Sequence, residues 1–217
     1  MNGLYAAYAG AKATWRELEV VADNVANATT TGFREQKVRF ELLNGAVHAT
    51  GGGYASDDGA LATDGVGTHL ALRGDAWFSL ADGSFTRDGR MKVSEDGTLV
   101  TTSGTPVLGQ SGPVVVEPGR PFTVTAEGQV LGPEGDEIDT LRLTSLQGAT
   151  PLGGGRWTGA GQPAVGAEVV QGALEGSNVV SMRSMVELVT ANRAFEAHQK
   201  AMQASDDAEQ RLLQIQG

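Results

Sequence analysis

Cysteine is absent from the 217-residue chain. Without thiols, the chain can form no disulfide, no thiolate nucleophile and no thiolate metal site. Histidine is nearly as scarce: only His48, His69 and His198 occur, and their spacing matches no metal-ligand motif. The phosphate-loop, H-E-x-x-H and G-x-S-x-G motifs are missing too. These absences predict a protein that is not an enzyme and holds no cofactor or metal.

Basic residues and long apolar runs are also lacking. Lys and Arg number 16 against 26 Asp and Glu, so the formal net charge is −10. Such a charge repels polyphosphate, and we expect no nucleic-acid partner. Hydrophobic residues make up 40% of the chain but are scattered, which predicts no membrane span. The start, MNGLYAAYAGAK, lacks the charged end and unbroken apolar core of a cleavable signal peptide.

Glycine, by contrast, is abundant, with 31 residues concentrated in the middle of the chain. Neither Gly nor Pro occurs from Ala11 to Asn27 or from Ser177 to Gln216. Helices tolerate neither residue well, so these two segments are typical of long helices. The sequence therefore predicts an α+β fold, in which coiled-coil-like helices at the N- and C-termini flank a central antiparallel all-β domain.

The first predicted helix carries a heptad stripe and ends at Gly32, where a positive φ is available. The stripe consists of Leu4, Tyr8, Ala11, Trp15, Leu18, Ala22 and Val25. The last helix is expected to begin at Ser177-Asn178, because both residue types cap helices. Its stripes are Leu188, Phe195 and Met202, and beside them Met185, Asn192 and Gln199. Such a mixture is typical of a surface packed against another helix, although an ordinary intramolecular core is the alternative.

The central part of the chain is predicted to form β structure. Five Asp-Gly pairs (at 58, 64, 82, 88 and 96) favour two-residue type I′ hairpin turns, with short apolar runs between them. The stretch 44–64 has little periodicity and is predicted to be extended. The expected domains are residues 1–32 (first helix), 33–66 (Gly-rich connector), 67–172 (β domain) and 173–217 (last helix). Since the connector separates the first helix from the β domain, its stripe is expected to pack on the last helix or on other copies.

Several short sequence motifs resemble those of one family. Residues 22–34, ADNVANATTTGFR, are similar to the N-terminal signature of bacterial flagellar rod and hook proteins, with Asp23 where Asn is usual. Residues 172–179, GALEGSNV, and 192–196, NRAFE, resemble the C-terminal words of that family. FTRDG at 85–89 and GTLV at 97–100 resemble its β-hairpins. The words occur at both ends and in the middle, in the family order.

The resemblance implies a structural subunit of the flagellar basal-body rod, exported through the flagellum's own channel and self-assembling helically in the periplasm. Expected partners are copies of itself, other rod proteins and the export apparatus. The implied assembly interface comprises Leu4, Tyr8, Ala11, Trp15, Leu18, Ala22, Asn24, Val25, Asn27, Met185, Leu188, Asn192, Phe195, Gln199 and Met202. Asn24 and Asn27 would bond between helices or end one. The helix-to-β-domain junctions would be Gly32, Phe33, Gly176, Ser177 and Asn178.

Three alternatives differ in how they use these features. PVLGQSGPV at 106–114, ASDDA at 204–208 and the short connector resemble the proximal-rod type, whereas a distal-rod subunit is the nearest alternative. A third reading is a periplasmic glycan-binding β module, which would expose aromatic side chains on a β face. Trp77 and Trp157 are the candidates for such a face.

Overall fold

The computed structural model describes residues 2–215. The side chains of residues 2–4, 209, 212, 213 and 215 lie outside the described part, which includes that of Leu4. The chain divides into two compact units. The helical unit contains Met1–Ala26, Gln36–Gly53 and Val180–Gly217, and the β unit contains Asn27–Glu35 and Tyr54–Val179. All β-strand pairs with a described register are antiparallel, so the predicted α+β class is confirmed.

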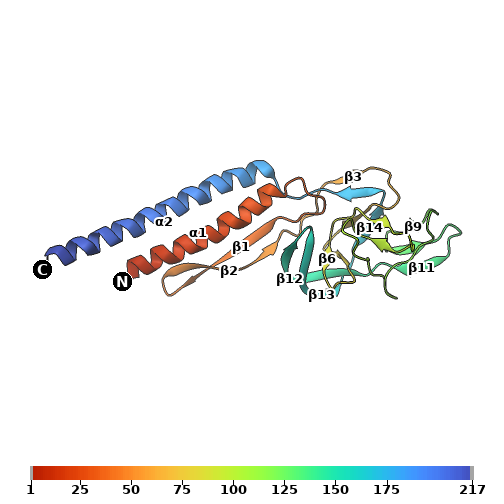
Figure 1. The fold of residues 1–217 in the computed structure, drawn as a ribbon, viewed down its shortest axis with the longest axis horizontal. Coiled ribbons are helices and arrows are strands. Elements are labelled where there is room, and N and C mark those ends of the chain that lie inside the picture. Colours follow the sequence, from red (N-terminus) through yellow and green to blue (C-terminus); the bar gives the residue numbers. More distant parts are fainter. Residues whose placement is uncertain (1, 216–217) are drawn as a thin grey trace. The chain divides into compact units, whose positions relative to one another are not determined.

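Two long antiparallel helices form most of the helical unit (Figure 1). Helix α1 spans Asn2–Ala26 and helix α2 spans Ser181–Ile215. The rings of Trp15 and Phe195 lie 5.4 Å apart across the helix pair. Helices α1 and α2 lie largely in the two segments that lack Gly and Pro, as the sequence predicted.

The structure differs from the predicted connector, because residues 36–54 form a β-hairpin. Strand β1 spans Gln36–Leu43 and strand β2 spans Ala46–Tyr54. Asn44 and Gly45 join them with φ of 52° and 76°, the positive values that a type I′ turn requires. The glycines at 51–53 weaken the apolar alternation of β2, which hides the strand in the sequence. This hairpin packs along one face of α1, to which Asn24 binds it through Gln36.

Helix α2 begins four residues later than the sequence predicted, so Ser177 and Asn178 do not cap it. Asn178 Oδ1 accepts the backbone N–H of Glu35 at 2.7 Å, and its Nδ2 donates to the Asp57 carbonyl at 2.7 Å. The Ser177 hydroxyl accepts the N–H of Val179 at 3.2 Å. Both side chains are thus used to fix the chain within the β unit.

Thirteen short strands build the β unit: β3 Leu61–Thr63, β4 Leu70–Arg73, β5 Trp77–Ser79, β6 Phe85–Thr86, β7 Lys92–Val93, β8 Leu99–Val100, β9 Thr123–Val124, β10 Gln129–Leu131, β11 Glu137–Thr140, β12 Leu143–Gly153, β13 Arg156–Pro163, β14 Glu168–Gln171 and β15 Ala173–Glu175. Strands β12, β13, β6 and β5 are hydrogen-bonded in a closed ring, and β9–β11 form a three-stranded sheet. Leu70, Leu72, Phe78 and Leu99 are among the fully buried residues of the main core.

Trp77 and Trp157 lie in a second, smaller core. Their ring centroids are 5.1 Å apart, and Tyr54 packs edge-on against both. Both tryptophans are buried, at 0% and 2% exposure. The alternative of a glycan-binding face built on these two side chains is therefore wrong, because neither ring reaches the surface.

The Asp-Gly pairs do not form the predicted type I′ turns. Among the described non-glycine residues only Asn44 has positive φ, so none of the five aspartates adopts the conformation that this turn demands. In three of the pairs only the glycine takes positive φ, and in the pair at 96 Gly97 donates to the Ser94 carbonyl at 3.0 Å and Ser94 donates to the Thr98 carbonyl at 2.9 Å. This arrangement is a three-residue hairpin loop with a bulge, which requires positive φ only at the glycine.

Gly89 is required for a close chain crossing, and its replacement should be costly. A Cβ at Gly89 would lie 1.6 Å from the carbonyl oxygen of Leu70, a backbone atom that cannot rotate away. We expect Gly89→Ala to destabilise the β unit by about 2 kcal/mol or more, as measured by urea unfolding. Gly67→Ala is the matched control, because a Cβ there meets no atom within 4 Å. Equal unfolding midpoints for the two variants would contradict the prediction.

Candidate assembly surface and charged cluster

The residues of the predicted α1 stripe differ in how deeply they are buried. Ala11 is buried, Leu18, Ala22 and Val25 are half-buried, and Tyr8 and Trp15 are exposed. The most buried side chains of α1 instead include Ala9, Ala13 and Val20, which the sequence reading missed. A second stripe of small apolar residues could have revealed them, because a helix covered on two sides needs two such stripes.

On α2 the structure separates the two predicted stripes. Leu188, Phe195 and Met202 are half-buried, whereas Met185, Asn192 and Gln199 are exposed. Ser184 and Ala191 are the most buried residues of α2. They belong to the same face as Leu188 and Phe195 but escaped notice because their side chains are small.

The helices approach closely where α1 has a glycine. A Cβ at Gly10 would lie 2.5 Å from Cε1 of His198. Beside this point is a cavity of about 330 Å³, whose lining includes Ala6, Ala13, Phe40 and His198. His198 therefore serves in packing within the helical unit.

Asn24 binds the hairpin rather than α2. It is buried, its Nδ2 donates to the Gln36 carbonyl at 2.9 Å, and its Oδ1 accepts the Gln36 N–H at 2.8 Å. These two hydrogen bonds fix the position of the first residue of β1 relative to α1. Asn27 lies in the β unit, where its Oδ1 accepts the hydroxyl of Thr30 at 3.1 Å.

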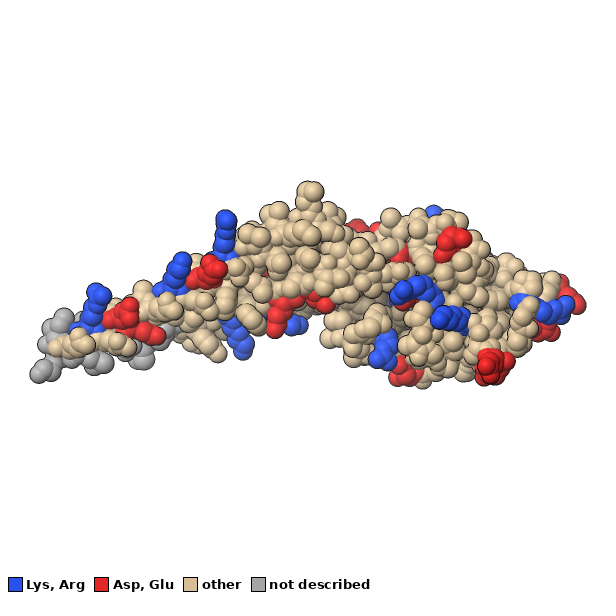
Figure 2. All heavy atoms as spheres, turned by 45° about the horizontal axis from the view of Figure 1, so that its top comes forward, with Lys and Arg blue, Asp and Glu red and all other residues tan. Residues whose placement is uncertain are grey.

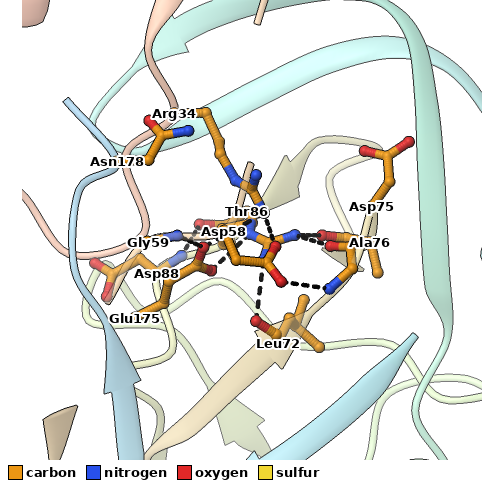
Figure 3. Close-up of polar contacts among 12 residues, drawn as sticks. Arg34, Asp58, Gly59, Leu72, Asp75, Ala76, Thr86, Asp88, Glu175 and Asn178 are labelled. Carbon is orange, nitrogen blue, oxygen red and sulfur yellow. Dashed lines mark hydrogen bonds and ion pairs between the residues drawn. The ribbon is translucent and has the colours of Figure 1, made fainter. Parts of the chain in front are cut away.

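Four charged side chains meet inside the β unit (Figure 3). Arg87 Nε lies 2.7 Å from Glu175 Oε2, and an Arg34 guanidinium nitrogen lies 3.3 Å from Glu175 Oε1. The same carboxylate oxygen of Asp58 contacts Arg34 at 2.7 Å and Arg87 at 3.3 Å. The side chains of Arg34, Arg87 and Glu175 are at most 1% exposed, and that of Asp58 is 35% exposed. Two cations and two anions give the cluster no net charge.

Backbone carbonyls accept several of the remaining guanidinium donors, whereas the buried Nε of Arg34 has no hydrogen-bond partner among the described residues. Arg87 donates to the carbonyls of Leu72, Gly74 and Ala76 at 3.0, 2.7 and 2.6 Å. Arg34 donates to the carbonyls of residues 55–57. Burial nevertheless lowers the pKa of Arg87, and the facing Glu175 carboxylate offsets part of that effect. Such a cluster is expensive to break, because loss of one member leaves a buried charge uncompensated.

The predicted junction residues surround this cluster. Gly32 has φ of +66°, and its N–H donates to the Glu175 carbonyl at 2.8 Å. A Cβ at Gly32 would lie 2.3 Å from the Arg87 carbonyl oxygen. Phe33 is buried with its ring centroid 6.4 Å from that of Trp157. The N–H of Gly176 donates to the Ala60 carbonyl at 2.8 Å.

Sequence reasoning missed the cluster as a unit, although a signal was present. Arg34, Arg87 and Glu175 each lie inside one of the family-like words at 22–34, 85–89 and 172–179. A charged residue embedded in each of three distant motifs indicates mutual pairing more readily than three separate surface roles.

Asp58 should make the β unit sensitive to acid. Burial alone would raise its pKa, but the Gly74 N–H, the hydrogen bond from Arg34 and the charges of Arg87 and Arg34 together hold that pKa below its ordinary value. A depressed pKa in the folded state contributes stability above the unfolded-state pKa of about 3.9, and this contribution disappears as pH falls through the folded-state value.

We therefore expect Asp58→Asn to lower the free energy of unfolding at pH 7 by about 1–2 kcal/mol, a figure reduced for the partial exposure of Asp58. The difference from the unchanged protein should shrink as the pH is lowered from 5 to 3. Urea unfolding at a series of pH values measures it. A difference that stays constant over this range would show that the Asp58 charge is not involved.

Charged side chains of both signs are interspersed on the face seen in Figure 2. Within residues 2–215, no group of three or more His, Asp or Glu side chains is arranged to hold a metal ion. Among the described helices, none combines the length and apolar character that a membrane span needs.

Three family models match the chain. They are described as "Flagella basal body rod protein" (residues 4–34), "Flagellar hook protein FlgE/F/G D1 domain" (71–132) and "Flagellar basal body rod FlgEFG protein C-terminal" (170–215). The first and third matches lie on the two terminal segments, and the second lies in the β unit.

Full-length relatives give the same result. The flagellar basal-body rod protein FlgF of Rhizobium meliloti is 32% identical over 236 aligned residues, covering 100% of this chain and 98% of the relative. FlgF of Salmonella typhimurium is 32% identical over 247 residues, covering 99% and 98%. The rod protein FlgG of Agrobacterium fabrum is 29% identical over 254 residues, covering 95% and 96%. The chain therefore belongs to the family of flagellar basal-body rod proteins, as a FlgF-like structural component of the basal body rather than an enzyme.

Proposed function

We propose that the chain is a subunit of the proximal rod. The observation that carries this proposal is its full-length similarity to FlgF: the two FlgF relatives described above are more similar than the FlgG relative, at 32% against 29% identity. Their alignments are also shorter, at 236 and 247 residues against 254, so they need fewer gaps. A distal-rod position is the alternative.

The terminal helices are the proposed assembly element. Met185, Asn192 and Gln199 are exposed on α2, and Tyr8 and Trp15 are exposed on α1. Large apolar side chains left in solvent are typical of a surface that a partner covers. In the rod, α1 and α2 would pack in coiled-coil fashion with the helices of neighbouring copies, forming the inner tube that encloses the export channel and transmits torque.

The junction residues Gly32, Phe33, Gly176, Ser177 and Asn178 are proposed to hold together the two segments of the β unit that lead from α1 and to α2. Partners would be other copies of the chain, other rod proteins and the export apparatus, with no nucleic acid among them. The rod crosses the periplasm, and export would proceed without a cleavable signal peptide. The absence of cysteine is compatible with an oxidising compartment, because no thiol is present to pair wrongly.

Imaging of purified basal bodies tests the proposal. A small compact tag inserted at the exposed turn 153–155, between β12 and β13, would add density to the β unit of each assembled copy. We expect this extra density at the end of the rod nearest the inner membrane. Density restricted to the distal rod would favour the FlgG-like alternative, and basal bodies without the chain would overturn both readings.

A further inference from the structure

The turn that joins β1 to β2 leaves an Asn-Gly pair in solvent. Asn44 and Gly45 are both exposed, with φ of 52° and 76°. A Cβ built at Gly45 would meet no atom within 4 Å, so the space beside this residue is open. Because glycine carries no Cβ of its own, its backbone nitrogen is easy to approach. The side-chain amide of Asn44 and the backbone nitrogen of Gly45 are thus neighbours in an open part of the hairpin.

Four other asparagines have described side chains, and they differ from Asn44 in two respects. Each makes a hydrogen bond that fixes its side-chain amide, and each precedes a residue whose Cβ crowds the next backbone nitrogen. They are Asn24, Asn27, Asn178 and Asn192, which precede Val25, Ala28, Val179 and Arg193. Asn2 also precedes a glycine, but its side chain lies outside the described part. Among asparagines with described side chains, Asn44 alone combines exposure with a following glycine.

These two neighbouring groups can react with each other. When solvent base removes the Gly45 amide proton, the nitrogen forms a bond to Cγ of Asn44 and closes a five-membered imide ring. The Cγ–Nδ2 bond breaks, and Nδ2 takes up a proton and leaves as ammonia. Water then opens the imide at either carbonyl carbon, which gives aspartate by one route and isoaspartate by the other. Because the attack is intramolecular, it needs no enzyme.

We propose that Asn44 is a site of self-modification, at which the chain converts its own amide to isoaspartate and aspartate with water as the only co-reactant. Exposure of the turn admits the water and lets ammonia leave. The glycine at 45 leaves the attacking nitrogen unhindered. The proposal is independent of where in the rod the chain assembles.

The isoaspartate product would alter the hairpin. Its main chain runs through the former side chain and gains one methylene, whereas a type I′ turn has room for two ordinary residues only. The residues next to the turn pack inside the helical unit: Ala46 is 3% exposed, and Gly45, Ala46 and Val47 line the cavity beside His198. Conversion also adds one negative charge to a chain with a formal charge of −10. The contact between the hairpin and the helices therefore loosens as a copy ages.

Peptide mapping of the purified full chain, incubated in neutral buffer, tests the proposal. Trypsin releases residues 40–73 and 184–193 as fragments that each contain one asparagine and no glutamine, Asn44 in the first and Asn192 in the second. The mass increase of an amide-to-acid conversion therefore reports on each site separately. We expect conversion at Asn44 to be about ten-fold or more faster than at Asn192, with isoaspartate detected by an isoaspartyl-specific methyltransferase. Equal conversion at the two sites, or aspartate without isoaspartate at 44, would overturn the proposal.

Two variants separate the chemistry from its effect on the hairpin. Gly45→Ala should slow conversion at Asn44 about ten-fold or more, and this holds even if strain at φ of 76° opens the turn, because the added Cβ crowds the nitrogen in every conformation. An unchanged rate in Gly45→Ala would contradict the imide route. Asn44→Gln lacks the five-membered ring closure, so amide hydrogen exchange of residues 46–50 should rise with incubation time in the natural chain and stay constant in this variant. Equal rises in both would show that conversion does not loosen the hairpin.

Discussion

Glu175→Gln should destabilise the β unit by about 3–5 kcal/mol, the range observed when one partner of a buried ion pair is removed. Glu175 faces Arg87 at 2.7 Å and Arg34 at 3.3 Å, and all three side chains are at most 1% exposed. Removing its charge leaves two buried guanidinium groups with only Asp58 to balance them. Urea unfolding followed by the fluorescence of buried Trp77 and Trp157, with Trp15 replaced by Phe, measures the loss in the β unit.

The matched control for this prediction is Glu168→Gln. Glu168 also faces an arginine, Arg73, but at 3.9 Å and with both side chains 59% exposed. An exposed pair of this kind contributes about 0–1 kcal/mol, so the control should unfold close to the unchanged protein. A double replacement, R87M/E175L, should lose less stability than the two single changes added together, because it removes both members of the pair. Similar midpoints for Glu175→Gln and Glu168→Gln would contradict the role assigned to burial.

Phe195→Asp should abolish motility and rod assembly. The Phe195 ring packs against Trp15 at 5.4 Å, on the face of α2 that also carries buried Ala191. An aspartate there places a charge between α1 and α2, and separation of the helices removes the surface that we propose for assembly. Swimming in soft agar and electron microscopy of basal bodies measure the effect, for which we expect motility below about one-tenth of normal.

Lys200→Asp is the control on the same helix. It introduces the same side chain at an exposed position of α2, and we expect normal rods and near-normal motility. The β unit of Phe195→Asp should keep its unfolding midpoint, because α2 contributes no residue to that unit. Normal rods in the Phe195→Asp strain would refute the assembly role of the helix pair.

The long helices could be predicted because their sequence signal is local. Two segments without Gly or Pro became α1 and α2, with the start of α2 displaced because Asn178 binds Glu35 and Asp57 instead of capping a helix. The tertiary use of Asn178 overrides its local preference. The hairpin escaped prediction for the opposite reason: its decisive signal is the single pair Asn44-Gly45, and the glycines of β2 obscure its apolar alternation.

The site was harder to predict than the fold. Periodicity marks where a helix is apolar, but it does not distinguish a face covered by the hairpin from one covered by α2 or left exposed. Tyr8 and Ala13 illustrate this, since the larger residue is exposed and the smaller one is buried. The charged cluster depends on contacts between residues up to 141 positions apart, as in the Arg34–Glu175 pair, and no local pattern reports such a distance.

Gly32 and Glu175 have a mechanical consequence. The N–H of Gly32 donates to the Glu175 carbonyl, and the N–H of Asn178 donates to the Phe33 carbonyl, so the segment that follows α1 is hydrogen-bonded to the segment that precedes α2. These hydrogen bonds and the Arg34–Glu175 ion pair join the same two segments, so a pull that separates the segments loads all of them. Several bonds therefore resist this separation together. We expect the two segments to come apart in one cooperative step instead of one strand at a time.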